Sequence, residues 1–429
     1  MGRTDAARAA DEGDVAAGAE SADEAPGSEA PRALRRWLLP ALVGLAALYA
    51  VTATWTTPYN VDAYTNALQA RSFADGSVLV DGYDDYVDPP YQGELTWLVR
   101  SPDGTTSQYP PGTALWAAPF YLFDTSVEIE QASVASDISD EQLTFPVPSM
   151  VPAALAAVAS VVVAMGFLGA SLQQLVGDRF ARGALAVAAL GTGAWSIAAD
   201  MLWQHGPAMM GISAGVYLAS RERYALSGVG FAFAVLVRPH TAVIAAAVGL
   251  AIAIRRRRLR PAVVMGATSA LGLAGVVLYN RMVFGEASIS GGYGNSFADR
   301  FADTPMDVLA GRVVGVFLDG QVGIFIYSPI LVLAFLGLWR ARRDTPDWAL
   351  GAAIGGALYL LVQIRANRIS GGVGFFGYRY PLEALMAAAP MLVIAVRSWM
   401  GDDELRRRLV LIAAGASIAI HATGAIAVF

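Results

Sequence analysis

The chain has 429 residues, of which 55% are apolar and only 15% are charged, and its mean hydropathy is +0.47. An ordinary soluble domain carries about 25% charged residues. The composition therefore excludes a soluble globular enzyme and a disordered protein, and it indicates a multi-span membrane protein. Cysteine is absent, which excludes a disulfide framework, a thiolate metal site and a cysteine nucleophile. All 30 basic residues are arginine, and 36 acidic residues give a net charge of −6.

The N-terminal segment, residues 1–36, is polar and acidic and has no hydrophobic period, so we expect a disordered tail. The first apolar run, Trp37 to Trp55, is long enough to cross a bilayer. Arg32, Arg35 and Arg36 precede it, and by the positive-inside rule they place the N-terminus in the cytoplasm of a plasma-membrane protein.

The remaining membrane domain, within residues 37–429, alternates apolar runs with clusters of arginine. The runs are 149–175, 183–199, 206–220, 225–237, 240–254, 261–282, 321–339, 348–363, 381–396 and 409–428. If the first run leads outwards, every arginine cluster falls on the cytoplasmic side. The predicted fold is an all-α integral membrane protein of about 11 transmembrane helices. The two short runs that meet at Arg238-Pro239 form either a tight hairpin or a broken helix.

Four segments then lie outside the membrane: the long first loop 56–148, and 200–205, 284–320 and 364–380. Within the first loop, the apolar stretch 112–123 is too short to span and is expected to be an interfacial or re-entrant helix. The segment 284–320 is rich in glycine and serine and suits a flexible lid.

Residues 60–74, directly after the first span, can form a helix lying along the membrane surface. Asp62, Asn66 and Gln69 share one face, and Tyr64 and Leu68 share another. A carboxylate in this position could act as a general base on an acceptor hydroxyl. The alternative is a helix N-cap at Asn60 or Asp62, without chemistry.

An acidic stretch follows that helix, with four aspartates at 81, 84, 85 and 88. Carboxylates at this density could bind a hard cation such as calcium. The spacing does not match an EF-hand loop, and a solvated acidic loop is the better interpretation. The three histidines of the chain are too few for a histidine-rich metal site, and His421, in the last span, is expected to be structural.

The order of these features resembles the GT-C superfamily of polytopic glycosyltransferases, in particular its protein O-mannosyltransferase and aminoarabinose-transferase-like branch. A first span is followed at once by an outside helix with Asn60-Val61-Asp62-Ala63-Tyr64, then by Tyr109-Pro110-Pro111-Gly112, and later by an Arg-Pro element. The similarity covers roughly residues 37–260 in order. The Trp-Trp-Asp-Tyr-Gly motif of oligosaccharyltransferases is missing, which argues against en bloc oligosaccharide transfer.

This resemblance implies an inverting transfer of a monosaccharide from a polyprenyl phosphate, outside the membrane, with Asp62 as the catalytic base. Tyr109 stands where the branch often has lysine. We expect the sugar or acceptor to contact Asn66, Tyr64, Tyr109 and Tyr378. A protein hydroxyl, a lipid-linked glycan or a polymer could be the acceptor. No cofactor is required, and a divalent cation is not demanded because one carboxylate is a poor cation cage.

The departing phosphate of such a donor needs cationic or hydrogen-bonding partners, and arginine grips phosphate oxygens well. Arg238 lies between two apolar runs. It either belongs to a functional site or extends its charged group to the membrane interface. The segment 365–380 mixes arginine, glycine and aromatic residues, and supplies Arg365, Arg368 and, as first choice, Arg379. His205 could bind phosphate or could cap the next helix.

Two other classes of protein remain as alternatives. A transporter or lipid-linked sugar flippase would favour matched inverted repeats, which the chain does not show. A non-catalytic scaffold leaves the two polar outside segments unexplained. No nucleic-acid partner is expected. The acidic, lysine-free composition suggests a haloarchaeal protein with a dolichyl carrier, although an all-arginine chain also fits a GC-rich genome.

Overall fold

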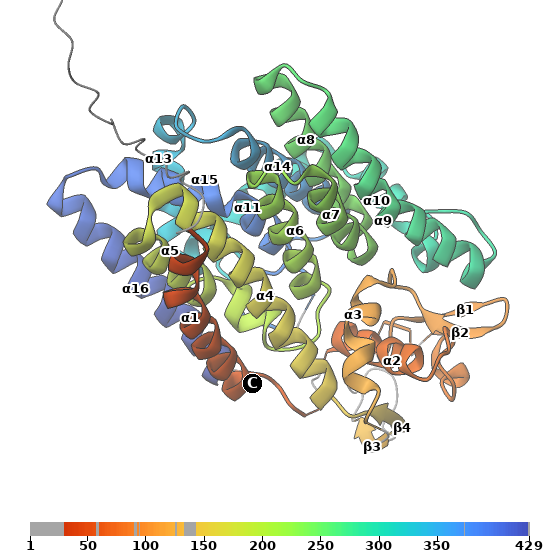
Figure 1. The fold of residues 1–429 in the computed structure, drawn as a ribbon. Helices are drawn as coiled ribbons and strands as arrows, with labels where there is room; N and C mark the ends of the chain where they lie inside the picture. The colour runs from red at the N-terminus through yellow and green to blue at the C-terminus, as the bar shows by residue number, and fades with distance from the viewer. Residues whose placement is uncertain are drawn as a thin grey trace, which may run out of the picture.

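The computed structural model describes residues 30–56, 60–89, 92–93, 95–124, 127–132, 143–372 and 374–427. The tail before residue 30 and the sequence Pro58-Tyr59 lie outside the described residues. In these parts of the chain the protein is a bundle of helices with two small β-hairpins (Figure 1).

The first half of the chain contains α1 (Ala30–Thr52), α2 (Val61–Ala74), η1 (Asp84–Tyr86), α3 (Gly112–Tyr121), α4 (Val151–Val176), α5 (Asp178–Leu190), η2 (Ala194–Ala198), α6 (His205–Ser220) and α7 (Tyr224–Val237). The second half contains η3 (Pro239–Thr241), α8 (Ala242–Arg256), α9 (Arg260–Phe284), η4 (Gly291–Tyr293), α10 (Ser296–Asp303), α11 (Met306–Leu318), α12 (Ile324–Tyr327), α13 (Ile330–Ala341), α14 (Asp347–Ala366), α15 (Leu382–Met400) and α16 (Glu404–Ala427). The η elements are single turns of 3₁₀ helix, except η2, which is a π-helical turn.

The hairpins are antiparallel: β1 (Leu98–Ser101) pairs with β2 (Gly104–Ser107), and β3 (Val127–Ala132) pairs with β4 (Leu143–Pro148). Together with α2 and α3 they gather at one end of the bundle (Figure 1). The described residues of the predicted outside loop 56–148 are thus folded, with a small apolar core of their own around Tyr64, Leu68 and Leu98.

Among the described residues, six helices are long and apolar enough to cross a membrane: α4, η3 with α8, α9, α14, α15 and α16. The shorter apolar helices include Arg36–Thr52, α7 and α13. Each of the apolar runs predicted from the sequence overlaps at least one helix. A mostly helical multi-span membrane fold is therefore confirmed, whereas the count of 11 crossings stays a prediction.

The segment 284–320, expected to be a flexible lid, is helical over much of its length. Residues Ser296–Asp303 form α10 and residues Met306–Leu318 form α11. Glycine and serine are densest in the stretch before α10, whereas Val313, Val314 and Val316 give α11 an apolar surface. The segment 112–123, in contrast, contains the expected short helix, α3.

The junction at Arg238-Pro239 is a break between two helices. Proline disfavours a helical conformation in the residue before it, and Arg238 is extended, with φ −145° and ψ 100°. The start of α3 packs against the end of α7, since a Cβ atom on Gly112 would lie 2.4 Å from the backbone nitrogen of Val237. These contacts bring the first outside loop directly beside Arg238.

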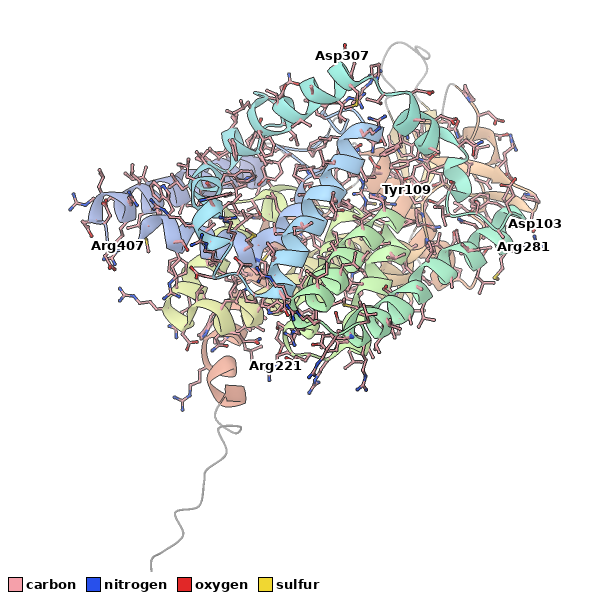
Figure 2. The ribbon with its side chains drawn as sticks, turned by 90° about the horizontal axis from the view of Figure 1, so that it is seen from above. Asp103, Tyr109, Arg221, Arg281, Asp307 and Arg407 are labelled. Atoms are coloured by element: carbon pink, nitrogen blue, oxygen red, sulfur yellow. The ribbon has the colours of Figure 1, made fainter. Side chains whose placement is uncertain are left out.

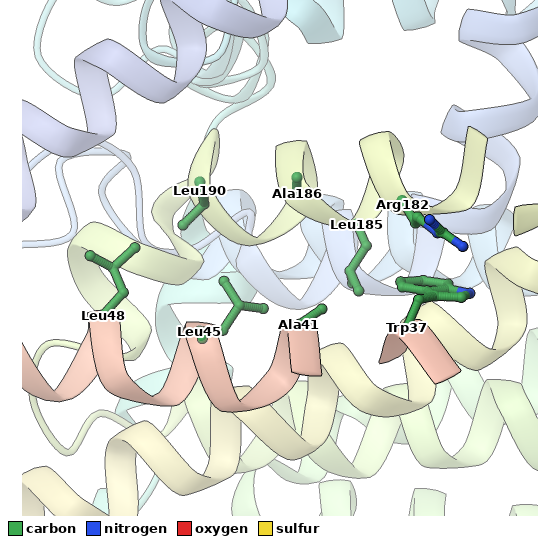
Figure 3. A pocket seen from close by; sticks show the side chains of 9 residues that line it. Trp37, Ala41, Leu45, Leu48, Arg182, Leu185, Ala186 and Leu190 are labelled. Atoms are coloured by element: carbon green, nitrogen blue, oxygen red, sulfur yellow. The ribbon is translucent and has the colours of Figure 1, made fainter. Parts of the chain in front are cut away.

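Away from this region, an apolar groove of about 360 Å³ runs between α1 and α5 (Figure 3). The guanidinium of Arg182 lies over the ring of Trp37, 5.6 Å from its centroid, at one end of the groove. Ala41, Gly44, Leu45 and Leu48 line the rest of its α1 wall. None of the predicted site residues lines this groove.

Candidate active site

The start of α2 places Asp62 and leaves its carboxylate available. Asn60 is the N-cap of α2, and its side chain accepts a hydrogen bond from the backbone nitrogen of Ala63 (3.1 Å). The sequence left open whether Asn60 or Asp62 is the cap. Because Asn60 takes that position, the Asp62 side chain is free for other partners on the first turn of the helix.

Asp62 forms an ion pair with Arg379, which lies 317 residues further along the chain. The Nη1 atom of Arg379 donates to Oδ2 of Asp62 at 3.0 Å, and the hydroxyl of Tyr109 donates to Oδ1. The Asp62 side chain is 26% exposed and that of Arg379 is 12% exposed. The pair is therefore partly open to its surroundings rather than sealed in the core.

The environment of Asp62 favours the ionised carboxylate. Burial alone would raise the pKa of Asp62, but the Arg379 guanidinium and the Tyr109 hydroxyl bring that pKa below its usual value. Burial, and next the Asp62 charge, raise the pKa of the Tyr109 hydroxyl well above its ordinary range. Tyr109 is therefore a protonated donor to a carboxylate at neutral pH.

The guanidinium of Arg379 is surrounded by aromatic rings. Its Cζ atom lies 4.8 Å from the ring centroid of Trp203, 5.2 Å from that of Tyr380 and 5.3 Å from that of Phe375. Gly371 approaches closely with φ +71°, and a Cβ atom there would lie 3.0 Å from Nε of Arg379. Gly371, Phe375 and Tyr380 of the segment 365–380 thus help to position Arg379.

A second charged cluster consists of Arg238, Glu383 and His205. The Nη1 atom of Arg238 donates to Oε1 of Glu383 at 2.9 Å. The same carboxylate oxygen lies 2.8 Å from Nδ1 of His205, and that nitrogen lies 2.9 Å from Nη1 of Arg238. Glu383 is completely buried, and the other two side chains are nearly so. His205 thus contacts a buried ion pair, and its predicted binding of phosphate or the acceptor stays a prediction.

Glu383 is a site residue that the sequence reading missed. It is the one carboxylate of the apolar run 381–396. An ionisable side chain inside such a run marks a functional or partnered position. That rule, applied here to Arg238 but not to the carboxylates, would have identified it.

The two clusters adjoin through shared aromatic side chains. The ring of His205 lies 6.3 Å from that of Trp203 and 6.4 Å from that of Tyr380, and both of these rings also contact Arg379. Asp62, Arg379, Arg238 and His205, predicted from four separate segments, therefore lie in one region. Tyr109, the fifth, joins them through Asp62.

Residues before and within α10 cover the edge of this region. The ring of Tyr293 lies 6.0 Å from that of Tyr109. Phe297 stacks on His240 with ring centroids 5.7 Å apart, and the His240 ring also stacks on Tyr359 at 5.0 Å and contacts the side chain of Gln363. The segment 284–320, expected to cover the site, does lie beside it, in a partly helical form.

Two predicted sugar or acceptor contacts on α2 are packed into the protein instead. Asn66 is fully buried and donates to the backbone oxygen of Leu202 at 3.0 Å. Gln69, on the same face, donates to the hydroxyl of Tyr279 at 2.8 Å. Tyr64 belongs to the small core of the outside unit. The face of α2 that was expected to present amides to a ligand binds neighbouring segments, and only Asp62 reaches the site.

Three predicted residues of the segment 365–380 also lie elsewhere. Arg365 donates through Nε to the backbone oxygen of Phe301 at 2.7 Å and so attaches α14 to α10. Arg368 is exposed. Tyr378 is buried, with its hydroxyl 2.7 Å from that of Ser328. The sequence alone could not distinguish these residues from Arg379.

The acidic stretch has protein partners. Asp88 forms an ion pair with Arg100 at 2.6 Å, and Asp84 accepts a hydrogen bond from the hydroxyl of Thr105. Across the described ranges, no group of three or more histidine, aspartate or glutamate side chains is placed to hold a metal ion. His421 is buried between the hydroxyls of Ser196 and Ser328.

No protein-family model matches the chain, and no curated protein matches it. Its fold is similar to that of a crystal structure of ArnT from Cupriavidus metallidurans bound to undecaprenyl phosphate. The TM-score is 0.53, with 14% identity over 90% of this chain and 75% of that one. A structure of the same ArnT in the apo state gives 0.48, with 15% identity over 90% and 77%. The similarity to the first of these structures confirms the resemblance to the aminoarabinose-transferase-like branch at the level of the fold alone.

Proposed function

We propose that the chain is an inverting glycosyltransferase that moves a monosaccharide from a polyprenyl phosphate to an acceptor hydroxyl on the extracytoplasmic face. The observation that carries this proposal is the partly exposed pair of Asp62 and Arg379. It puts a carboxylate base beside a cation that suits a phosphate leaving group. The similarity in fold to a structure that holds undecaprenyl phosphate supports the class of carrier.

The chemistry assigned to the two side chains is a single displacement. Asp62 takes the proton of the acceptor hydroxyl as its oxygen forms a bond to the anomeric carbon of the sugar. The bond from that carbon to the phosphate oxygen breaks, and its electron pair leaves with the phosphate. Arg379 stabilises the departing phosphate. Attack opposite the leaving group inverts the anomeric centre.

Arg379 is a better phosphate ligand than Arg238, because their carboxylate partners differ in accessibility. Glu383, the partner of Arg238, is 0% exposed, and it neutralises that guanidinium inside the bundle. The pair of Asp62 and Arg379 keeps side-chain exposures of 26% and 12%. We therefore assign Arg238 a supporting role and Arg379 the direct contact.

An extracytoplasmic position for the candidate site is supported by the positive-inside rule and by the positions of labelled residues in the molecule. Arg221, in a cluster predicted to be cytoplasmic, lies at the opposite edge of the molecule from Asp307 (Figure 2). Tyr109 lies nearer to Asp307 than to Arg221 in this view. The candidate site is thus associated with the segments predicted to face outwards. A dolichyl carrier and a protein or glycan acceptor are proposed from composition and resemblance.

The test is transfer by the purified protein in liposomes, with labelled monosaccharides on a polyprenyl phosphate or on a nucleotide as competing donors. We expect transfer only from the lipid donor, and loss of that transfer in Arg379→Gln. Arg368→Gln, an exposed arginine of the same segment, is the matched control and should retain activity. Transfer from the nucleotide donor alone, or equal activity in the two variants, contradicts the proposal.

A further inference from the structure

The two charges that the proposed reaction requires occupy one another in this structure. Both oxygens of Asp62 hold a donor, one from Tyr109 and the other from Arg379. A carboxylate held in this way is a weak base, because its negative charge is already stabilised. Arg379, in turn, donates through Nη1 to Asp62, although the proposed reaction requires this guanidinium to bind the phosphate of the donor.

The contact between Asp62 and Arg379 leaves donor capacity on the guanidinium. A guanidinium has five N–H donors in a rigid fork, and only Nη1 is given to the carboxylate, in a one-point contact rather than the stronger two-point arrangement. The buried Nε atom of Arg379 has no hydrogen-bond partner among the described residues. An anion with several oxygens can therefore satisfy this side chain better than Asp62 does.

The position of the guanidinium does not depend on Asp62 alone. Trp203, Phe375 and Tyr380 lie around it at 4.8–5.3 Å from their ring centroids. Cation–π contacts of this kind hold an arginine in place without satisfying its N–H donors. Removing the Asp62 charge should thus leave Arg379 in position with one more donor free.

We propose that the phosphate group of the lipid donor displaces Asp62 from Arg379, so that binding of the donor releases the base. This inference rests on the proposed function. It makes the order of binding compulsory: the carboxylate becomes available to the acceptor only after the phosphate has taken its place on the guanidinium. By linkage, the free energy of the contact between Arg379 and Asp62 is subtracted from the free energy with which the protein binds the phosphate.

The experiment measures equilibrium binding of undecaprenyl phosphate to the detergent-solubilised full chain, without sugar or acceptor. Undecaprenol measures the contribution of the lipid tail, and inorganic phosphate measures that of the free anion. Asp62→Asn should bind undecaprenyl phosphate about fivefold more tightly than the wild type, or better. Asp75→Asn is the matched control, because Asp75 pairs with Arg71 at the exposed end of the same helix. The affinity of this variant for undecaprenyl phosphate should equal that of the wild type. Arg379→Gln should lose the preference for the phosphate over the alcohol.

The outcomes separate this inference from the proposed function. Equal binding of undecaprenyl phosphate and undecaprenol by the wild type overturns the proposed donor. A wild type that prefers the phosphate, with Asp62→Asn unchanged or weaker, overturns only the displacement. Asp62→Ala is measured in parallel and must also bind more tightly, and a monodisperse elution profile establishes that each variant is folded. Tight binding of inorganic phosphate alone would replace the lipid by a free anion as the displacing group.

Discussion

Glu383→Ala should destabilise the protein strongly, because it leaves Arg238 as a buried charge without its carboxylate. Glu383 is 0% exposed and the Arg238 side chain is 9% exposed. Breaking a buried ion pair by removing one partner costs about 3–5 kcal/mol. Here the carboxylate also lies 2.8 Å from His205, so we expect a loss of at least about 3 kcal/mol in the free energy of unfolding.

The assay is reversible denaturant unfolding in detergent, followed by tryptophan fluorescence. Glu404→Ala removes a surface carboxylate that pairs with Arg408 at i,i+4, and it should cost less than about 1 kcal/mol. The double variant Arg238→Met with Glu383→Leu removes both charges and should recover most of the loss. If Glu383→Ala costs no more than Glu404→Ala, or if the double variant is as unstable as the single one, Glu383 does not stabilise a buried cation.

Three further changes test the surroundings of the site. Tyr109→Phe removes a donor to Asp62 and so raises the carboxyl pKa, and the acidic limb of the pH–rate profile should move to higher pH. Burial raises the pKa of Asp200 to about 7, so unfolding measurements should show stability falling as the pH rises from about 4 to about 7, and Asp200→Asn should abolish that slope. Gly112→Ala places a Cβ atom 2.4 Å from the backbone of α7 and should lower the free energy of unfolding by about 1–3 kcal/mol. Gly311→Ala, inside α11, meets nothing within 4 Å and should not destabilise the protein, because alanine favours a helix over glycine.

The helices of the bundle were predictable because helices that cross a bilayer must be built largely from apolar residues, which form recognisable runs in the sequence. Long apolar runs bounded by arginine have one stable solution in a bilayer, and each predicted run overlaps a helix. The helices within the segment 284–320 were not predicted, because composition is a poor guide where helices are short. The first part of the segment is rich in glycine and serine, and this composition gave no sign of the apolar surface of α11.

The centre of the candidate site was also predictable, since Asp62 and Arg379 stand out as charges in unusual surroundings. Their contact joins segments 317 residues apart, and no local pattern could give it. Spacing on a helix did not show that Asn66 is buried against Leu202, because that depends on which segments pack on α2. The partner of Arg238 was missed for the same reason: Glu383 reaches it only after α7 and α15 have packed.

The central claim is that Asp62 is the base in a sugar transfer from a lipid phosphate. The most direct test compares the rates of transfer by wild type and Asp62→Asn under a saturating concentration of a polyprenyl-phosphate monosaccharide. Loss of a positioned general base lowers such a rate by about 10²–10⁴-fold. We predict a fall in this range in Asp62→Asn with donor binding retained, and Asp75→Asn at the wild-type rate. Equal rates for wild type and Asp62→Asn would contradict the account.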